Sequence, residues 1–174
     1  MPIIKYSPLH SLHLKNKAKF IEFSGWTMPF SYKGTIKEHQ FVRQNNGYFD
    51  VSHMGRLVID NDYLQKVSTL ICSDLLELKS GKALYSIFTD DNGSALDDVI
   101  FWKYDEYVLL ICNAANTEKI RNYLQTEEIF YQDLTEKTAL VAVQGPKAIS
   151  NLETLLPIPG SFSCLSNDKY TYAR

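Results

Sequence analysis

The stretch ALYSIFT at Ala83–Thr89 begins the region that decides the fold, and LDDVIFWK at 96–103 and YVLLICN at 107–113 follow it closely. Together they predict three consecutive β-strands. Asp91, Asn92 and Gly93 lie between the first two, and these residue types accept the positive φ that a tight hairpin turn requires. The chain is therefore expected to fold around an antiparallel meander.

The middle strand contains two adjacent carboxylates in an otherwise apolar run. Because side chains alternate along a strand, the two carboxylates point to opposite faces. One face carries Leu96, Asp98, Ile100 and Trp102, and the other carries Asp97, Val99, Phe101 and Lys103. Both faces are largely apolar, which predicts a central strand covered on both sides. An ionised aspartate there is costly unless it is paired, hydrated or used in chemistry.

The hairpin loops decide which residues lie beside Asp98. A four-residue loop at 103–106 places Trp102 opposite Tyr107 and Asn113 diagonal to Asp98. A loop at 90–93 places Tyr85 directly opposite Asp98. A two-residue turn at 92–93 keeps Tyr85 on the same face, because a slip of two residues preserves sidedness. Either way, a carboxylate, a phenol, an amide and an indole share one side of the sheet, as a polar binding site requires. The alternative is that Asp98 is a solvated edge residue.

Composition excludes several classes of function. The chain has 174 residues, 45% of them apolar, and its 18 basic and 20 acidic residues give a net charge of −2. This balance favours neither a nucleic acid nor a membrane surface as partner. The cysteines, Cys72, Cys112 and Cys164, are odd in number and far apart, which favours a reducing, cytoplasmic setting over a disulfide framework. Neither a signal peptide nor an apolar run of membrane-spanning length is visible.

Two other constellations suggest chemistry but carry little weight. His10 and His13 could ligate a metal, yet no Cys, Asp or Glu lies at ligand spacing nearby, so no metal is expected. Asp50, Ser52 and His53 invite a hydrolase interpretation. Because Gly-x-Ser-x-Gly and an oxyanion-hole motif are absent, a catalytic triad is disfavoured.

The rest of the chain supplies further helix and strand signals. Helices are expected after Ser7-Pro8, over 35–46, after a cap at Asn61 or Asp62, over 117–125 behind an Asn116 cap, and after Gly145-Pro146. Strands are expected at 18–23, 56–60, 138–144 and 169–173, and an aromatic-rich loop at 25–34. These signals predict an α+β fold of mixed and antiparallel sheets with packed helices. Possible sub-domains are about 1–50 plus 138–174, and 51–137.

Several short motifs occur in order along nearly the whole chain. They are AKF at 18–20, FSGW at 23–26, MP at 28–29, FDVSHMG at 49–55, GKALYS at 81–86, LDD at 96–98, NAAN at 113–116 and QGPKA at 144–148. In combination they resemble the N-terminal part of the glycine cleavage system T protein, a folate-dependent aminomethyltransferase.

The resemblance implies a one-carbon transfer reaction. The family takes an aminomethyl group from the lipoyl arm of the glycine cleavage H protein, releases ammonia and forms 5,10-methylenetetrahydrofolate from tetrahydrofolate. Asp98 matches the family's catalytic carboxylate, which acts on the attacking folate nitrogen. Residues matching the lining of the folate pocket are Met54, Tyr85, Ile100, Trp102 and Asn113. Trp102 stands where an aromatic such as tyrosine is common.

The chain departs from the family pattern at its C-terminal end. Family members continue beyond the position of Arg174 with a Thr-Gly-Tyr-Thr-Gly-Glu motif and a second half that binds the folate. The C-terminal half is therefore expected to be absent, because the chain is a fragment, one piece of a split enzyme whose second chain carries the rest, or a decayed copy.

Three functions follow from the resemblance. The first is an aminomethyltransferase whose remainder lies elsewhere. The second is a truncated, non-catalytic fragment or interaction module. The third is a folate-binding paralogue of iron–sulfur protein maturation or methylamine oxidation. The stretch 49–55 and the Asp97-Asp98 pair favour the first over the third. The expected location is the cytoplasm, or the mitochondrial matrix in a eukaryotic source, although no transit peptide is seen.

Overall fold

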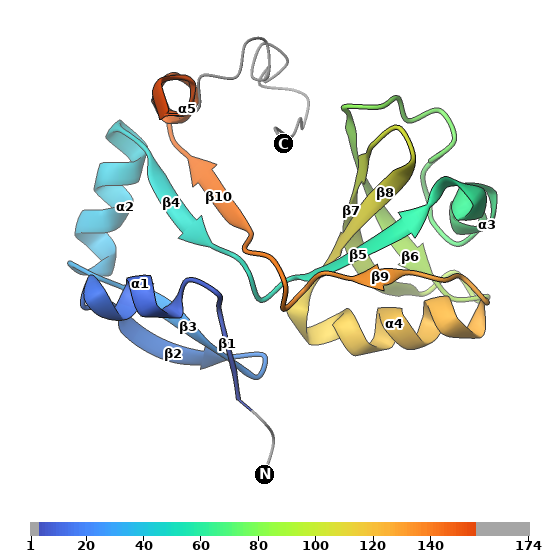
Figure 1. Cartoon of the computed structure of the whole chain (residues 1–174), viewed down its shortest axis with the longest axis horizontal. Coiled ribbons are helices and arrows are strands. Elements are labelled where there is room, and N and C mark those ends of the chain that lie inside the picture. Colours follow the sequence, from blue (N-terminus) through green and yellow to red (C-terminus); the bar gives the residue numbers. More distant parts are fainter. Residues whose placement is uncertain (1–3, 156–174) are drawn as a thin grey trace. The chain divides into compact units, whose positions relative to one another are not determined.

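The computed structural model describes residues 4–155, which divide into two compact units (Figure 1). Within the described range, one unit comprises residues 4–53 and 135–155, and the other comprises residues 54–134. The strand expected at 169–173 and Cys164 lie outside the described residues. No helix within residues 4–155 has the length and apolar character needed to cross a membrane.

The second unit is built on one antiparallel sheet of five strands, ordered β6-β7-β8-β5-β9. Its strands are β5 (Gly55–Asp60), β6 (Ala83–Thr89), β7 (Ala95–Lys103), β8 (Tyr107–Cys112) and β9 (Gln132–Asp133). The consecutive strands β6, β7 and β8 form the expected meander, and each begins and ends within one residue of the expected position. Figure 1 shows this sheet with α3 (Leu64–Thr69) and α4 (Thr117–Thr126).

The residues of β7 that are fully buried lie on one face of the strand. Asp97, Val99 and Phe101 on that face are 4%, 1% and 0% exposed. They lie in or beside a cluster to which α3 and α4 contribute Val67, Ile120 and Leu124. The face with Asp98, here called the Asp98 face (Leu96, Asp98, Ile100 and Trp102), is half-buried or exposed. The expectation that both faces are covered holds only in part: Ile111, opposite Ile100 on the Asp98 face, is 2% exposed, but Asp98 itself is exposed.

The first hairpin has the register of the two-residue-turn alternative, whereas the register of the second hairpin differs from the expected one by two residues. Ile87 lies opposite Asp98, and Tyr85 lies opposite Ile100, which is the alignment of a two-residue turn, with a bulge between Phe88 and Thr89. Trp102 faces Leu109 rather than Tyr107. The second loop is shorter than the expected 103–106, since Lys103 pairs with Val108 and the Tyr104 N–H donates to the Tyr107 carbonyl. One further step of this register sets Asn113 opposite Asp98, not diagonal to it as expected. Direct opposition of Tyr85 and Asp98 was wrong, but the shared face was right.

At the first helix start of this unit the capping side chain differs from the expected one, and at the second the expected residue occupies the N-cap position without a capping bond. A 3₁₀ turn, η1 (Asn61–Tyr63), precedes α3, and the Asp60 side chain accepts a hydrogen bond from the Asp62 N–H. A second turn, η2 (Ala114–Asn116), precedes α4, and the Asn116 side chain makes no capping bond. That side chain donates to Asp97 instead.

The first unit contains a three-stranded sheet of order β1-β3-β2, formed by β1 (Lys5–Tyr6), β2 (Lys19–Phe23) and β3 (Trp26–Ser31), with α1 (His10–Lys15). The segment expected to be an aromatic-rich loop is therefore mostly strand, because Trp26 and Met28 alternate as buried residues. Pro29 is tolerated in this middle strand because β1 pairs only with Trp26 and Thr27.

A two-stranded antiparallel sheet completes the first unit. It consists of β4 (Gly47–Asp50) and β10 (Val141–Gln144), and α2 (Thr35–Gln44) and α5 (Ala148–Leu155) adjoin the same end of it, where Gly47 pairs with Gln144. Gly145 has a φ of 123°, and a Cβ there would meet backbone atoms of Val42, Asn45 and Asn46. A side chain would therefore disturb the close approach of the segment before α5 to the end of α2.

Candidate active site

Asp98 lies near the start of β7, and its two carboxylate oxygens each accept one side-chain hydrogen bond. The Tyr85 hydroxyl donates to Oδ2 at 3.1 Å, and the Asn113 Nδ2 donates to Oδ1 at 2.7 Å. The predicted phenol and amide therefore contact the predicted carboxylate. Asp98 is solvent-exposed rather than enclosed.

An apolar strip continues from Asp98 along the same face of the sheet. Ile100 lies between Tyr85 on β6 and Ile111 on β8 in the strand registers. Trp102 follows two residues later, and the strand rise of about 3.3 Å per residue puts it roughly 13 Å from Asp98. Both side chains are half-buried. The strip therefore offers an apolar and aromatic surface beside a fixed carboxylate.

Met54 lies at the end of the sheet next to Asn113. Gly55 pairs with Cys112, so one further step of this register sets Met54 beside Asn113. The Met54 carbonyl accepts a hydrogen bond of 2.6 Å from the Arg56 guanidinium. All six predicted site residues thus belong to one unit, and four strands of one sheet place them.

Asp97 is a functional candidate that the sequence did not single out for a role. Its buried carboxylate accepts hydrogen bonds from the backbone N–H and the Nδ2 of Asn113, both at 2.9 Å, and from the Asn116 Nδ2. Burial of an ionised carboxylate is tolerated only when its oxygens are satisfied in this way. The sequence signals were the carboxylate pair in an apolar strand and the two asparagines, Asn113 and Asn116, that come after the next strand.

The arrangement leaves Asp98 able to bind a ligand donor. A carboxylate has about four acceptor positions, and the side chains of the described residues occupy two of those on Asp98. An exposed carboxylate held by two donors is fixed in orientation and can still accept from an amine. This chemistry suits a flat heteroaromatic ligand with N–H groups.

The residues considered for metal binding and hydrolysis have other roles. No group of three or more His, Cys, Asp or Glu is placed to hold a metal within residues 4–155. His10 packs between the rings of Tyr6 and Phe20. His13 bonds to the Tyr32 hydroxyl at 2.6 Å and to Asp50 at 2.7 Å.

The contacts of Asp50, Ser52 and His53 indicate structural roles. The Ser52 N–H donates to Asp50, and the Ser52 hydroxyl bonds to the Leu140 backbone. His53 packs edge-on against Phe23. Burial alone would raise the pKa of Asp50, but hydrogen bonds from Ser52, Ser7 and His13 outweigh it and hold the pKa below its ordinary value. The network joins α1 to β4 and is structural.

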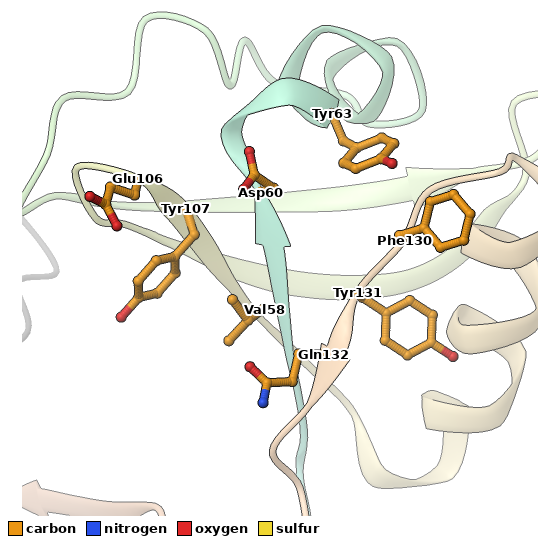
Figure 2. A pocket seen from close by; sticks show the side chains of 8 residues that line it. All are labelled: Val58, Asp60, Tyr63, Glu106, Tyr107, Phe130, Tyr131 and Gln132. Atoms are coloured by element: carbon orange, nitrogen blue, oxygen red, sulfur yellow. The ribbon is translucent and has the colours of Figure 1, made fainter.

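A shallow pocket of about 350 Å³ lies elsewhere on the same unit (Figure 2). Its lining residues are Val58, Asp60, Tyr63, Glu106, Tyr107, Phe130, Tyr131 and Gln132. Tyr107 begins β8 and Asn113 directly follows it, so the strand rise separates them by roughly 20 Å. None of the predicted site residues lines this pocket, so the two sites are distinct.

Comparison with known proteins identifies the family. Residues 9–169 match the family model described as the GCVT N-terminal domain. The chain belongs to this family. The aminomethyltransferase of Desulforamulus reducens is 37% identical over 163 residues, which are 91% of this chain and 45% of that protein. The aminomethyltransferase of Chloroherpeton thalassium is 36% identical over 165 residues, or 90% of this chain and 45% of that protein.

A solved GCVT-family structure supports the α+β fold. The crystal structure of glycine cleavage system aminomethyltransferase T from Bartonella henselae superposes with a TM-score of 0.78 at 32% identity. The match covers 90% of this chain and 45% of that protein. The resemblance seen in the sequence and the expected fold class are confirmed. The chain spans a little under half the length of these relatives, all of which carry the name of a transferase.

Proposed function

We propose that this chain supplies the catalytic carboxylate of a tetrahydrofolate-dependent aminomethyltransferase of the glycine cleavage system. The observation that supports this most is Asp98, an exposed carboxylate held between the Tyr85 hydroxyl and the Asn113 amide. The reaction would pass a one-carbon unit from the aminomethyl-lipoyl arm of the H protein to tetrahydrofolate, with release of ammonia.

The residues of the Asp98 site fit the chemical groups of tetrahydrofolate. Asp98 retains acceptor positions for an N–H of the ligand, and Ile100 and Trp102 offer surface for its ring system. Met54, Tyr85 and Asn113 would complete the part of the folate-binding wall that this chain supplies. When bound, tetrahydrofolate supplies the nucleophilic nitrogen that accepts the one-carbon unit.

Asp98 would act by orienting that nitrogen and taking up its proton as the new bond to carbon forms. General-base assistance of this kind contributes about 10²–10⁴ in rate. Tyr85 and Asn113 would keep the carboxylate in position throughout the step. Ile100 and Trp102 would hold the ligand beside it.

The partners follow from the same proposal. The lipoylated H protein would deliver the aminomethyl group. A further polypeptide, either continuous with this chain or a second chain, would supply the rest of the folate site, because the matched relatives are about twice as long. The scattered cysteines favour the cytoplasm as the location of this reaction.

A binding map tests the proposed site. Tetrahydrofolate added to the ¹⁵N-labelled chain should shift the amide resonances of the β7 residues around Asp98 and those of Tyr85 and Asn113. Shifts confined to the pocket in Figure 2, which Tyr107 and Tyr131 line, would contradict the placement of the ligand. Asp98→Asn should reduce the shifts, and Asp105→Asn, the same change in an exposed loop residue, should not.

A further inference from the structure

Asp97 and Asp98 are neighbours in sequence but lie in different environments. Asp97 points into the core side of β7 and is 4% exposed, whereas Asp98 lies on the Asp98 face and is exposed. One residue, Asn113, contacts both. Its Nδ2 donates to Asp97 Oδ1 at 2.9 Å and to Asp98 Oδ1 at 2.7 Å.

Asp97 holds Asn113 at two points. Besides accepting from the Asn113 side chain, it accepts from the Asn113 backbone N–H through its other oxygen at 2.9 Å. Asn113 lies just beyond the end of β8 and just before η2, so the strand ladder does not fix it. Asp97 therefore holds in place a residue of the connection between β8 and η2 that the strand pairing does not hold.

We propose that Asp97 is a positioning residue that acts through Asn113 to orient the Asp98 carboxylate; its effect on catalysis rests on the function proposed above. A carboxamide has a donor end and an acceptor end. Because Asp97 accepts from Nδ2, a flipped amide would direct its oxygen toward a buried carboxylate. Asp97 thus keeps the donor end of Asn113 directed toward Asp98, even when the charge on Asp98 changes during a reaction.

The third donor to Asp97 provides a matched control. Asn116 donates its Nδ2 to Asp97 Oδ1, but it makes no bond to Asp98. The Thr117 hydroxyl donates to the Asn113 carbonyl at 3.1 Å and belongs to the same connection. A purely structural role for Asp97, joining β7 to the start of α4, would make Asn113 and Asn116 equivalent. The positioning role makes only Asn113 important for Asp98.

The rotamer of Asn113 tests the positioning directly in the 174-residue chain. Three-bond couplings to Cγ and the two Nδ2 proton shifts should report a single χ1 rotamer in the wild type. Asp98→Asn changes an exposed side chain and should leave that rotamer unchanged, because Asp97 still holds Asn113. Rotamer averaging of Asn113 in Asp98→Asn would overturn the proposal.

The second arm removes the anchor itself. Asp97→Asn keeps the volume but places a donor against one of the Asn113 N–H groups, so Asn113 should become rotamerically averaged while resonances outside β7, β8 and η2 stay in place. Asn116→Ala should retain the single rotamer. An unchanged Asn113 rotamer in a folded Asp97→Asn chain would contradict the proposal. If the Asp97→Asn chain does not fold, the Asn113 rotamer in Asp98→Asn decides whether the proposal stands.

Ligand binding and turnover then separate this proposal from the proposed function. Asp97→Asn and Asn113→Ala should each weaken tetrahydrofolate binding by about 2- to 10-fold, the ratio that one hydrogen bond provides, and together no further. Additive losses would show that Asp97 does not act through Asn113. If Asp98→Asn, in an enzyme completed with the C-terminal half of a full-length aminomethyltransferase, turns over like the wild type, the proposed function fails, while the rotamer measurements still decide whether Asp97 positions Asn113.

Discussion

Replacing Asp50 with asparagine should destabilise the first unit by about 3 kcal/mol at neutral pH. The Asp50 side chain has no exposed surface. Its Oδ2 accepts from the Ser7 hydroxyl and from His13 Nε2, and its Oδ1 accepts from the Ser52 N–H. Asparagine fits the same space but carries no charge and has only one acceptor oxygen, so it cannot accept from Ser7, His13 and Ser52 together as the carboxylate does.

The magnitude follows from these contacts. A hydrogen bond to a charged group contributes about 1.5–3 kcal/mol, and breaking a buried pair by changing one partner costs about 3–5 kcal/mol. Since asparagine can keep some of these hydrogen bonds, the loss of unfolding free energy should lie near the lower end of the range for breaking a buried pair. No cavity contribution is expected, because the two side chains have nearly equal volumes.

The effect should depend on pH in a defined direction. Hydrogen bonds hold the folded-state pKa of Asp50 below its ordinary value. A carboxyl group whose pKa is lowered by folding contributes its full stabilisation at pH values above its unfolded-state pKa of about 3.9. This contribution is lost as the pH falls through its folded-state pKa. The difference between wild type and Asp50→Asn should therefore be complete at pH 7 and should shrink below about pH 4.

Each unit contains one tryptophan, so urea unfolding can be followed separately in each. Trp26 is buried in β3 of the first unit, and Trp102 lies on β7 of the second. In a Trp102→Phe background, fluorescence reports the first unit alone. Glu22→Gln, the same charge change on an exposed residue of β2, is the control. A loss below about 1 kcal/mol for Asp50→Asn, or a loss that grows on acidification, would refute the reasoning.

Three further predictions concern packing, reactivity and ligand affinity. Gly55→Ala should destabilise the second unit by about 1–3 kcal/mol in urea unfolding, because its Cβ would overlap the buried Cys112 and Thr117 side chains, and a neutral result would show that the site relaxes. Burial raises the pKa of Cys112 to about 11, so at pH 8 iodoacetamide should modify the exposed Cys72 far faster than Cys112. Peptide mass spectrometry would measure both rates, and equal rates would contradict this prediction. The isolated chain should bind tetrahydrofolate weakly in calorimetry, and micromolar or tighter affinity would contradict the proposed need for a further polypeptide.

The sequence was informative wherever local pattern decides structure. Alternation and the turn residues at 91–93 located the meander and placed Tyr85, Asp98 and Asn113 on one side. The sequence left two registers open for the first hairpin, one of which is observed, and gave the second hairpin a register wrong by two residues, because a two-residue slip leaves the alternation pattern unchanged.

Contacts between distant segments could not be predicted in the same way. His13 and Asp50 lie 37 residues apart, and nothing local indicates that α1 packs against β4. The role of Asp97 depends on how the connection after β8 folds back to β7, which tertiary packing determines. The strand β3 was missed because its aromatic and proline content is typical of a loop.

The rate of methylenetetrahydrofolate formation by Asp98→Asn tests the central claim most directly. The chain would be completed with the C-terminal half of a full-length aminomethyltransferase and supplied with aminomethylated H protein, with Asp105→Asn as the matched control. Turnover should fall by about 10²–10⁴ in Asp98→Asn, with unfolding free energy unchanged and the control fully active. Wild-type turnover in Asp98→Asn would contradict the assignment of Asp98 as the catalytic carboxylate.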